Sequence, residues 1–310
     1  MTNTVKAVKK PRFQSKMKYV KQNKVLYFML LPTLIFFIIF HVIPIYGMKL
    51  AFFDYKIMGD DVFAGLKYFQ KLFSTPTFLQ ILGNTLIISA MKIFMIFPLP
   101  IIFALMLNEF KAGKFRKSIQ VVSYLPHFLS WVVIAGIWFS FLSPSTGILN
   151  NILNSLGLES VDLLTSKGAI RWILLASEAW RSIGWDSIIY MAAILGIDST
   201  LYKAARMDGA SRWQVIKGII LPALTTTMVT VLILNIGFFM NAGLDQVLNF
   251  TNPAVNSEID IIDTYVYRIG LQNSQYSFAT AANLFKGIVG TVLIITTHLT
   301  SKKLTGKGAW

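Results

Sequence analysis

The chain has 310 residues, of which 55% are hydrophobic and only 14% are charged, and its mean hydropathy is +0.59. A soluble domain is not built from this composition, so we expect an all-α membrane protein whose helices each cross the ~30 Å hydrocarbon core with ~20 residues. The sequence contains no cysteine and its three histidines fall in separate apolar segments, which excludes disulfides and thiol chemistry and predicts no metal site.

The first 24 residues are predicted to form a basic cytoplasmic tail. They contain eight lysine or arginine residues and no acidic residue. A tail that binds nucleic acid is one interpretation, but an anchor on the anionic cytoplasmic face of a membrane is favoured, and we predict no nucleic-acid partner. The apolar run that follows is too long for a signal peptide, and it predicts a first transmembrane helix with Pro32 and Pro44 as kink or boundary.

Six transmembrane spans are predicted from the apolar runs. They cover residues 25–45, 84–107, 121–142, 172–195, 223–241 and 284–300. Because no repeat or linker interrupts them, we expect one transmembrane domain from 25 to 301, followed by a short cytoplasmic tail at 302–310.

The distribution of lysine and arginine predicts which side of the membrane each loop faces. The N-terminal tail, the loops 108–120 and 196–222 and the tail from 301 together hold 19 of these residues, whereas the other three loops hold seven. By the positive-inside rule, both termini and the 201–222 segment are expected on the cytoplasmic side.

The two long external loops are rich in acidic and other polar residues. They cover residues 46–83 and 242–283, and their acidic residues are Asp54, Asp60, Asp61, Asp245, Glu258, Asp260 and Asp263. These loops are long enough to form a polar rim for a soluble donor protein. The alternative is that they only connect spans.

The fourth span carries ionisable residues at membrane depth. Glu178, Arg181 and Trp185 recur at i, i+3 and i+7, with Trp180 and Asp186 beside them. Ionisable groups inside a bilayer are costly unless they face protein or water, so this face is expected to point inward. It then either contacts a substrate or contains a structural pair between Glu178 and Arg181.

The fifth span offers a second candidate substrate face. On a helix, Asn235, Phe238, Phe239 and Ala242 would share this face, and Asn241 lies nearby. Asparagine both donates and accepts hydrogen bonds, and an aromatic ring can lie against the apolar side of a sugar, so this face is suited to a neutral polyhydroxylated ligand. Packing alone is the alternative explanation for the phenylalanines.

The segment Leu201–Pro222 is predicted to fold into two short helices that meet at a corner. Asp198 can cap the first helix, and Gly209 supplies the left-handed residue that ends it. Ser211 and Gln214 have the spacing of a capping box for the second helix, which is expected to end at Pro222. Its apolar face would consist of Trp213, Ile216 and Ile220.

This segment also carries a family pattern, A-A-x-x-D-G-A followed by I-x-L-P. It comprises Ala204, Ala205, Asp208, Gly209 and Ala210, and then Ile219–Pro222. The pattern resembles the cytoplasmic EAA loop of permease subunits in binding-protein-dependent ABC importers. The resemblance implies a coupling helix seated in a cleft of a separate ATPase, with Lys203 in place of the usual glutamate. We expect Trp213 to fill an apolar pocket of that partner as an aromatic anchor.

Other stretches are similar to the LplB-type branch of carbohydrate-uptake permeases. They are residues 125–131 (LPHFLSW), the tail from Lys302 to Trp310, and the basic N-terminus. The resemblance implies a type I ABC importer permease fold in a bacterial plasma membrane, and oligosaccharides or polysaccharide fragments as cargo. It implies as partners a second permease in a heterodimer, two copies of a cytoplasmic ATPase that bind ATP and Mg, and an extracytoplasmic solute-binding protein.

Two other functions stay open at this point. An importer permease for a peptide, amino acid or ion would share the same coupling segment. An integral-membrane enzyme acting on lipid-linked sugars would need paired carboxylates, and Asp60–Asp61 is the only adjacent acidic pair. The sequence has no GxxxxGK[ST] phosphate loop, so we expect that the chain is not an enzyme and that a partner hydrolyses ATP.

Overall fold

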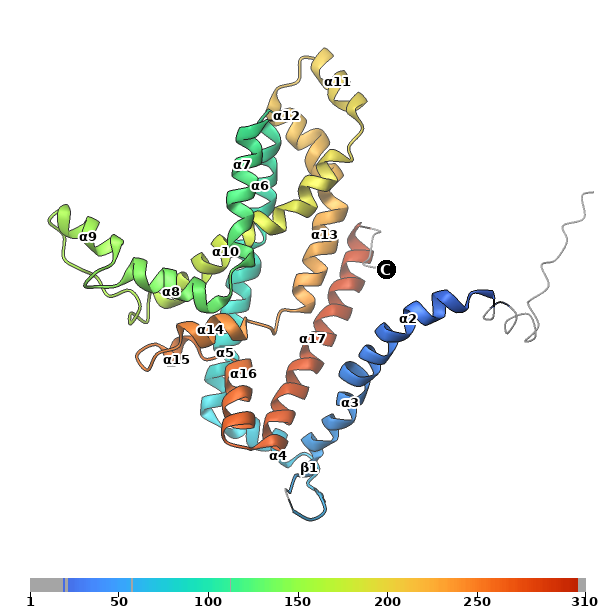
Figure 1. Ribbon diagram of the computed structural model, residues 1–310, viewed down its shortest axis with the longest axis vertical. Coiled ribbons are helices and arrows are strands. Elements are labelled where there is room, and N and C mark those ends of the chain that lie inside the picture. The colour runs from blue at the N-terminus through green and yellow to red at the C-terminus, as the bar shows by residue number, and fades with distance from the viewer. Residues whose placement is uncertain (1–18, 20–21, 57, 112, 306–310) are drawn as a thin grey trace, which may run out of the picture.

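The computed structural model describes residues 19, 22–56, 58–111 and 113–305. The predicted basic tail lies mostly outside this part of the chain, as does the end of the C-terminal tail from residue 306. Long helices dominate the described residues (Figure 1), which confirms the all-α prediction. The exception is a small antiparallel hairpin in which Phe53 pairs with Phe63 and Asp54 with Val62.

The elements follow one another in two groups, separated by the loop before residue 170. The first group is α2 (Lys24–Phe37), η1 (Ile38–Val42), α3 (Ile43–Gly47), η2 (Met48–Phe52), β1 (Phe53–Asp54), β2 (Val62–Phe63), α4 (Lys67–Ser74), α5 (Pro76–Met91), η3 (Lys92–Ile96), α6 (Pro98–Glu109), α7 (Lys114–Tyr124), η4 (Leu125–Phe128), α8 (Trp131–Leu142) and α9 (Ile148–Ser155). The second group is α10 (Ile170–Leu195), α11 (Ser199–Met207), α12 (Arg212–Val215), η5 (Ile216–Ile220), α13 (Leu221–Gly237), α14 (Leu244–Phe250), α15 (Asn256–Ile259), α16 (Ile262–Val266), η6 (Tyr267–Gln272) and α17 (Tyr276–Thr305).

Within the described residues, four continuous helices are long and apolar enough to cross a membrane, and the number is up to six if each of two bent pairs is one span. The continuous helices are Lys24–Phe52, Pro76–Glu109, Arg212–Gly237 and Tyr276–Thr300. The bent pairs are Lys114–Phe128 with Trp131–Leu142 and Ile170–Leu195 with Ser199–Met207. Six spans were predicted, which is the upper of these counts, and the third and fourth predicted spans correspond to the bent pairs.

The third predicted span, 121–142, is not one continuous helix. The chain bends by 107° between η4 and α8. Leu129 and Ser130 are extended, and the Ser130 hydroxyl accepts a hydrogen bond from the Val133 N–H to begin α8. An N-cap inside the apolar run therefore divides it.

Pro222 does not end the second helix of the corner, contrary to the prediction. The helix continues without a break through η5 into α13. Three π turns of the described chain share one arrangement: η1, η3 and η5 each end two residues before a proline, at Pro44, Pro98 and Pro222. The residue before each proline donates its N–H five residues back, and this wider turn relieves the clash of the proline ring with the preceding turn.

Three clusters of buried side chains hold the helices together. One joins α6, α10, η5 and α13, and Tyr190, Leu107 and Ile220 are among its buried members. A second joins α4, α5, α16 and α17, and the third lies where α8 and α10 meet α14 and the segment after it. Helix α10 therefore runs through two of the clusters, and it contacts α6, α7 and α13 among other elements.

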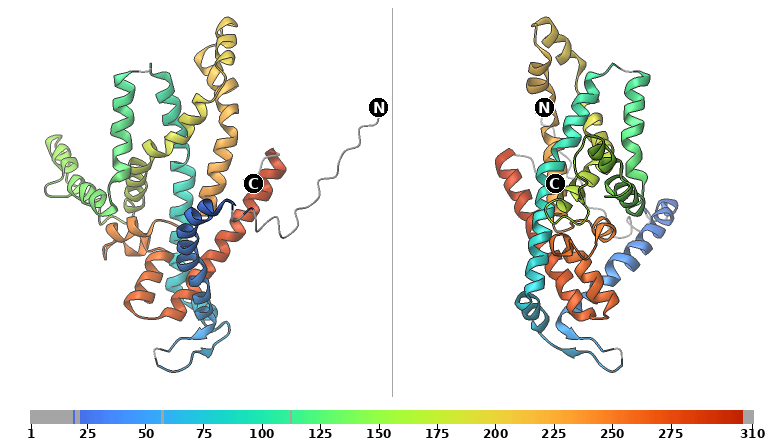
Figure 2. Two further views of the ribbon diagram at one scale, coloured as in Figure 1. Left: turned by 45° about the vertical axis from the view of Figure 1, so that its right-hand side comes forward. Right: turned by 90° about the vertical axis from the view of Figure 1, so that its left-hand side faces the viewer.

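The first span stands apart from this bundle. In Figure 1 and in Figure 2, the helix Lys24–Phe52 diverges from the other spans, and it meets them mainly where η2 packs on α17. None of the side chains in its most apolar stretch is buried. An apolar helix of 29 residues thus presents its surface to lipid or to another chain.

The two long polar loops pack against each other and against the spans. Their acidic residues are mostly paired: Asp54 with Lys67, Asp61 with Lys49, Glu258 with Arg171, Asp260 with Arg268 and Asp263 with Lys286. The Lys67 hydrogen bond, helped by Tyr68, lowers the pKa of Asp54 from its ordinary value. These loops are therefore ordered parts of the fold as well as connections.

Candidate functional site

The corner between α10 and α13 lies at one end of the molecule (Figure 1). The Asp198 side chain accepts a hydrogen bond from the Thr200 N–H at 2.9 Å, which caps α11 and lowers the pKa of Asp198. Gly209 is left-handed with a φ of 70°, and the Ala210 N–H bonds back to the Ala205 carbonyl to close the helix end. The predicted cap and the predicted left-handed glycine are confirmed.

The second helix of the corner begins with the predicted capping box. The Ser211 hydroxyl accepts from the Gln214 N–H, and the Gln214 side chain accepts from the Ser211 N–H at 2.6 Å. Two local hydrogen bonds thus fix the direction in which the chain leaves the corner.

The outer surface of the corner is open. Helix α11 contains no buried residue, and Lys203, Ala204, Asp208 and Gly209 are exposed whereas Ala205 and Ala210 are half-buried. The Trp213 side chain is 67% exposed, with Lys217 over its ring, and Met207, which the sequence pattern did not single out, is 89% exposed. An apolar aromatic left exposed on a rigid corner is typical of a docking surface.

The inner side of the corner is fastened to the spans. Arg212 forms an ion pair with Glu109 at 2.6 Å, which ties α12 to the end of α6. Tyr202, Val215 and Ile216 pack against the buried cluster shared by α6, α10 and α13. The corner is therefore held to these three helices by packing as well as by an ion pair.

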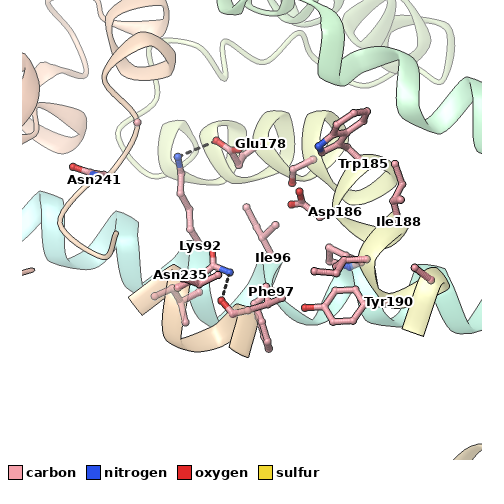
Figure 3. A pocket seen from close by; sticks show the side chains of 18 of the residues that line it. Lys92, Ile96, Phe97, Glu178, Trp185, Asp186, Ile188, Tyr190, Asn235 and Asn241 are labelled. Atoms are coloured by element: carbon pink, nitrogen blue, oxygen red, sulfur yellow. Dashed lines mark hydrogen bonds and ion pairs between the residues drawn. The ribbon is translucent and has the colours of Figure 1, made fainter. Parts of the chain in front are cut away.

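A cavity of about 840 Å³ lies between η3, α10 and α13. Its polar lining residues include Lys92, Glu178, Asp186, Asn235 and Asn241. Its apolar walls come from these helices and from the beginnings of α6 and α8, and the side chains are Ile93, Ile96, Phe97, Pro100, Trp131, Trp185, Ile188, Ile189, Val231 and Leu234. Figure 3 shows Lys92 reaching across to Glu178 on the facing helix.

Half of the predicted substrate residues line this cavity. They are Glu178, Trp185, Asn235 and Asn241, and the Trp185 ring is stacked on the His127 ring at 4.4 Å. Glu178 and Trp185 lie on one side of α10 because a spacing of seven residues is close to two helical turns.

The other four predicted substrate residues lie elsewhere. Trp180 lines a separate groove between α7 and α10, and Arg181 lies over the Trp131 ring at 5.0 Å. Phe239 packs in the cluster of α5 and α17, and Phe238 is 66% exposed. The shared helical face predicted for the fifth span does not form, because α13 ends at Gly237 and the chain then turns.

The structure pairs Glu178 with Lys92, not with Arg181. The Lys92 Nζ lies 3.0 Å from the Glu178 Oε2, and the Arg181 guanidinium instead donates to the His127 carbonyl at 3.5 Å. Sequence reasoning did not assign Lys92 to the site. The available signal was a lysine within an apolar span, where an ionisable residue is costly without a partner.

The cavity offers both hydrogen-bond donors and acceptors. The Asp186 carboxylate faces the cavity, and none of the described residues forms a hydrogen bond or ion pair with it. Amides, a carboxylate and an indole ring together can bind hydroxyl groups and the apolar side of a sugar ring. Among the described residues, no group of three or more His, Asp or Glu side chains is placed to hold a metal ion.

Comparison with known proteins identifies the family. Residues 97–302 match the family described as "Binding-protein-dependent transport system inner membrane component". The chain belongs to this family. It is an ABC importer permease with several membrane helices, as the corner pattern predicted.

The permease has curated relatives over almost its whole length. It is 38% identical to Protein LplB of Bacillus subtilis, over 94% of this chain and 93% of the relative. It is also 38% identical to the polygalacturonan/rhamnogalacturonan transport system permease protein YteP of the same organism, over 93% of this chain and 91% of the relative. The second relative is named as a transport system permease, which agrees with the prediction that the chain is not an enzyme.

The permease also resembles solved structures. A chain of a bacterial alginate ABC transporter, in complex with an alginate pentasaccharide-bound periplasmic protein, matches with a TM-score of 0.87 and 39% identity. The match covers 94% of this chain and 98% of that chain. The fold is therefore that of an ABC importer permease, as predicted.

Proposed function

We propose that this permease lets oligosaccharides or polysaccharide fragments cross the bacterial plasma membrane. It acts as half of a heterodimer with a second permease, receives cargo from an extracytoplasmic solute-binding protein, and is driven by two copies of a cytoplasmic ATPase that bind ATP and Mg. One transmembrane domain from 25 to 301 lies between cytoplasmic tails at 1–24 and 302–310. The relatives named for polygalacturonan and rhamnogalacturonan and for alginate support this class of cargo.

The observation that carries the proposal is the cavity between the spans, whose apolar walls carry several polar side chains. Its amides, Asn235 and Asn241, and its indole ring, Trp185, are suited to a hydroxylated ring, and its volume of about 840 Å³ accommodates a sugar unit. Asp186 and Glu178 add acceptors for hydroxyl donors. The second permease supplies the facing half of the path.

The corner is the proposed docking site for the ATPase. Lys203, Ala204, Ala205, Asp208, Gly209, Ala210 and Trp213 form it. When ATP binding closes the ATPase pair, the corner moves with it and carries α10 and α13, so the cavity opens to the outside and accepts cargo. Lys203 replaces the usual acid of the family pattern and meets an acidic group of the partner.

The first span supports the proposed heterodimer. The helix Lys24–Phe52 has an apolar surface that its own chain leaves uncovered, and Phe28 and Met29 are among its most exposed side chains. A second permease of the same kind offers apolar helices of matching length, so the helix Lys24–Phe52 packs against it within the bilayer.

Trp185→Ala is expected to raise the KM for oligosaccharide uptake about tenfold, because the lost contact with a sugar ring removes ~1.4 kcal/mol of binding free energy. The measurement is ATP-dependent uptake of labelled oligosaccharide into proteoliposomes that contain the complete transporter. Trp180→Ala is the matched control, because Trp180 is on the same helix and similarly exposed but lines a different groove. Its KM is expected to stay within about twofold of the parent.

Equal effects of the two tryptophan substitutions would contradict the cavity as the sugar path. Uptake of a peptide, amino acid or ion in place of any oligosaccharide would contradict the proposed cargo and favour the importer of a non-sugar solute.

A further inference from the structure

Lys92 has all three of its N–H donors occupied by protein acceptors. Its Nζ lies 3.0 Å from the Glu178 Oε2, 2.8 Å from the Ala242 carbonyl oxygen and 2.7 Å from the Gln246 Oε1. These acceptors come from α10, from the turn after α13 and from α14. One ammonium group on η3 therefore joins α10 to the segment 242–246, and these three parts of the chain are far apart in the sequence.

Gln246 extends this junction into α10. The side chain is completely buried, and its Nε2 donates to the Leu174 carbonyl at 2.6 Å and to the Ser177 hydroxyl at 2.9 Å. The beginning of α14 is thus fixed to the first part of α10 through the amide nitrogen and to Lys92 through the amide oxygen.

Gly243 fits the junction for two reasons. It is left-handed with a φ of 102°, a conformation that favours glycine, and an added Cβ would lie only 2.9 Å from the Lys92 Nζ. The backbone turn between α13 and α14 and the approach of Lys92 therefore depend on the same residue.

The junction lies at the end of α13 opposite the corner. Residues 212–237 form one continuous helix from the corner to the turn (Figure 1), so a displacement at α12 reaches the turn without a flexible link. Lys92 itself begins the π turn η3, a kind of irregularity that is frequent at functional sites.

We propose that Lys92 is a positioning residue that clamps the α13–α14 turn to α10, and so holds one wall of the cavity in place until the corner moves. This rests on the proposed function insofar as the corner is moved by an ATPase. A direct role in binding cargo is disfavoured because Lys92 has no donor left for a ligand. Release of the turn then lets Asn241, which lies in it, move away from the cavity.

The sequence has no native cysteine, so one introduced thiol reports on the turn without background from this chain. We place it with Asn241→Cys and measure the rate at which a membrane-impermeant maleimide labels the nucleotide-free transporter. Adding Lys92→Met is expected to raise this rate at least about fivefold, because the turn opens more often once the clamp is lost. Adding Lys92→Arg, which keeps a charged donor, is expected to restore most of the parent rate.

Lys167→Met is the control for loss of a lysine, since Lys167 is exposed and away from the cavity, and it is expected to leave the labelling rate unchanged. If Lys92→Met does not assemble, Gly243→Ala tests the same junction with Lys92 intact and should raise the rate similarly. A labelling rate within about twofold of the parent in the assembled variants would overturn the inference. A raised KM for oligosaccharide uptake together with an unchanged labelling rate would also overturn it, because Lys92 would then be a cargo contact. The labelling rate does not depend on which cargo is transported. If Lys92→Met raises the labelling rate but the transporter does not take up oligosaccharide, only the proposed cargo is rejected.

Discussion

Trp213→Ala is expected to abolish ATP-driven uptake while leaving the permease in the membrane. Trp213 is a large aromatic exposed on a corner that is otherwise rigid, and truncation of such an anchor costs ~2 kcal/mol or more of binding. This corresponds to roughly 30-fold weaker association with the ATPase. The measurement is co-purification of the ATPase with the permease, combined with uptake into proteoliposomes.

Leu271→Ala is the matched control, because Leu271 is also 67% exposed but lies away from the corner, in η6. It is expected to keep both ATPase association and uptake. The geometry of the corner is tested at one position by two substitutions: Gly209→Val should lose uptake, whereas Gly209→Asn, which tolerates a left-handed backbone, should retain most of it. Full uptake by Trp213→Ala and Gly209→Val would reject the corner as the coupling element.

Gly184→Ala is expected to destabilise the permease strongly. Gly184 lies on α10 where α7 crosses it, and an added Cβ would overlap the carbonyl group and side chain of Ser123. The backbone of α7 would have to move, which places the cost near the upper end of the ~1–3 kcal/mol typical of overpacking. The measurement is thermal unfolding of the purified permease in detergent.

Gly136→Ala provides the comparison for this substitution. Gly136 also lies inside a helix, α8, but an added Cβ there would meet no atom within 4 Å. It is expected to leave the unfolding temperature unchanged or to raise it slightly, because alanine favours helix by up to ~1 kcal/mol over glycine. Equal unfolding temperatures for the two variants would contradict the close crossing of α7 and α10.

The corner could be predicted from the sequence because its contacts are local. The Asp198 cap, the helix end at the left-handed Gly209 and the Ser211–Gln214 capping box each involve residues no more than five apart. Such signals do not depend on the rest of the fold, whereas the role of Pro222 does. A π turn before it, stabilised by packing of Ile220 against α6 and α10, lets the helix continue.

The cavity could be predicted only in part. Helical periodicity places Glu178 and Trp185 on one side of α10, but the partner of Glu178 is Lys92, which is 86 residues away in the sequence. The early end of α13 at Gly237 also depends on distant contacts, since the Lys92 junction fixes the turn that follows it. The helical periodicity was extended beyond Gly237, and this wrongly placed Phe238 and Phe239 on one helical face with Asn235.

The orientation of the corner is the claim on which the proposed mechanism depends. The test is labelling of a single thiol, introduced by Asp208→Cys, with a membrane-impermeant maleimide in right-side-out and in inside-out vesicles; the native chain has no cysteine. We predict labelling in inside-out vesicles and protection in right-side-out vesicles, because an ATPase can reach the corner only from the cytoplasm. Labelling in right-side-out vesicles would contradict the account.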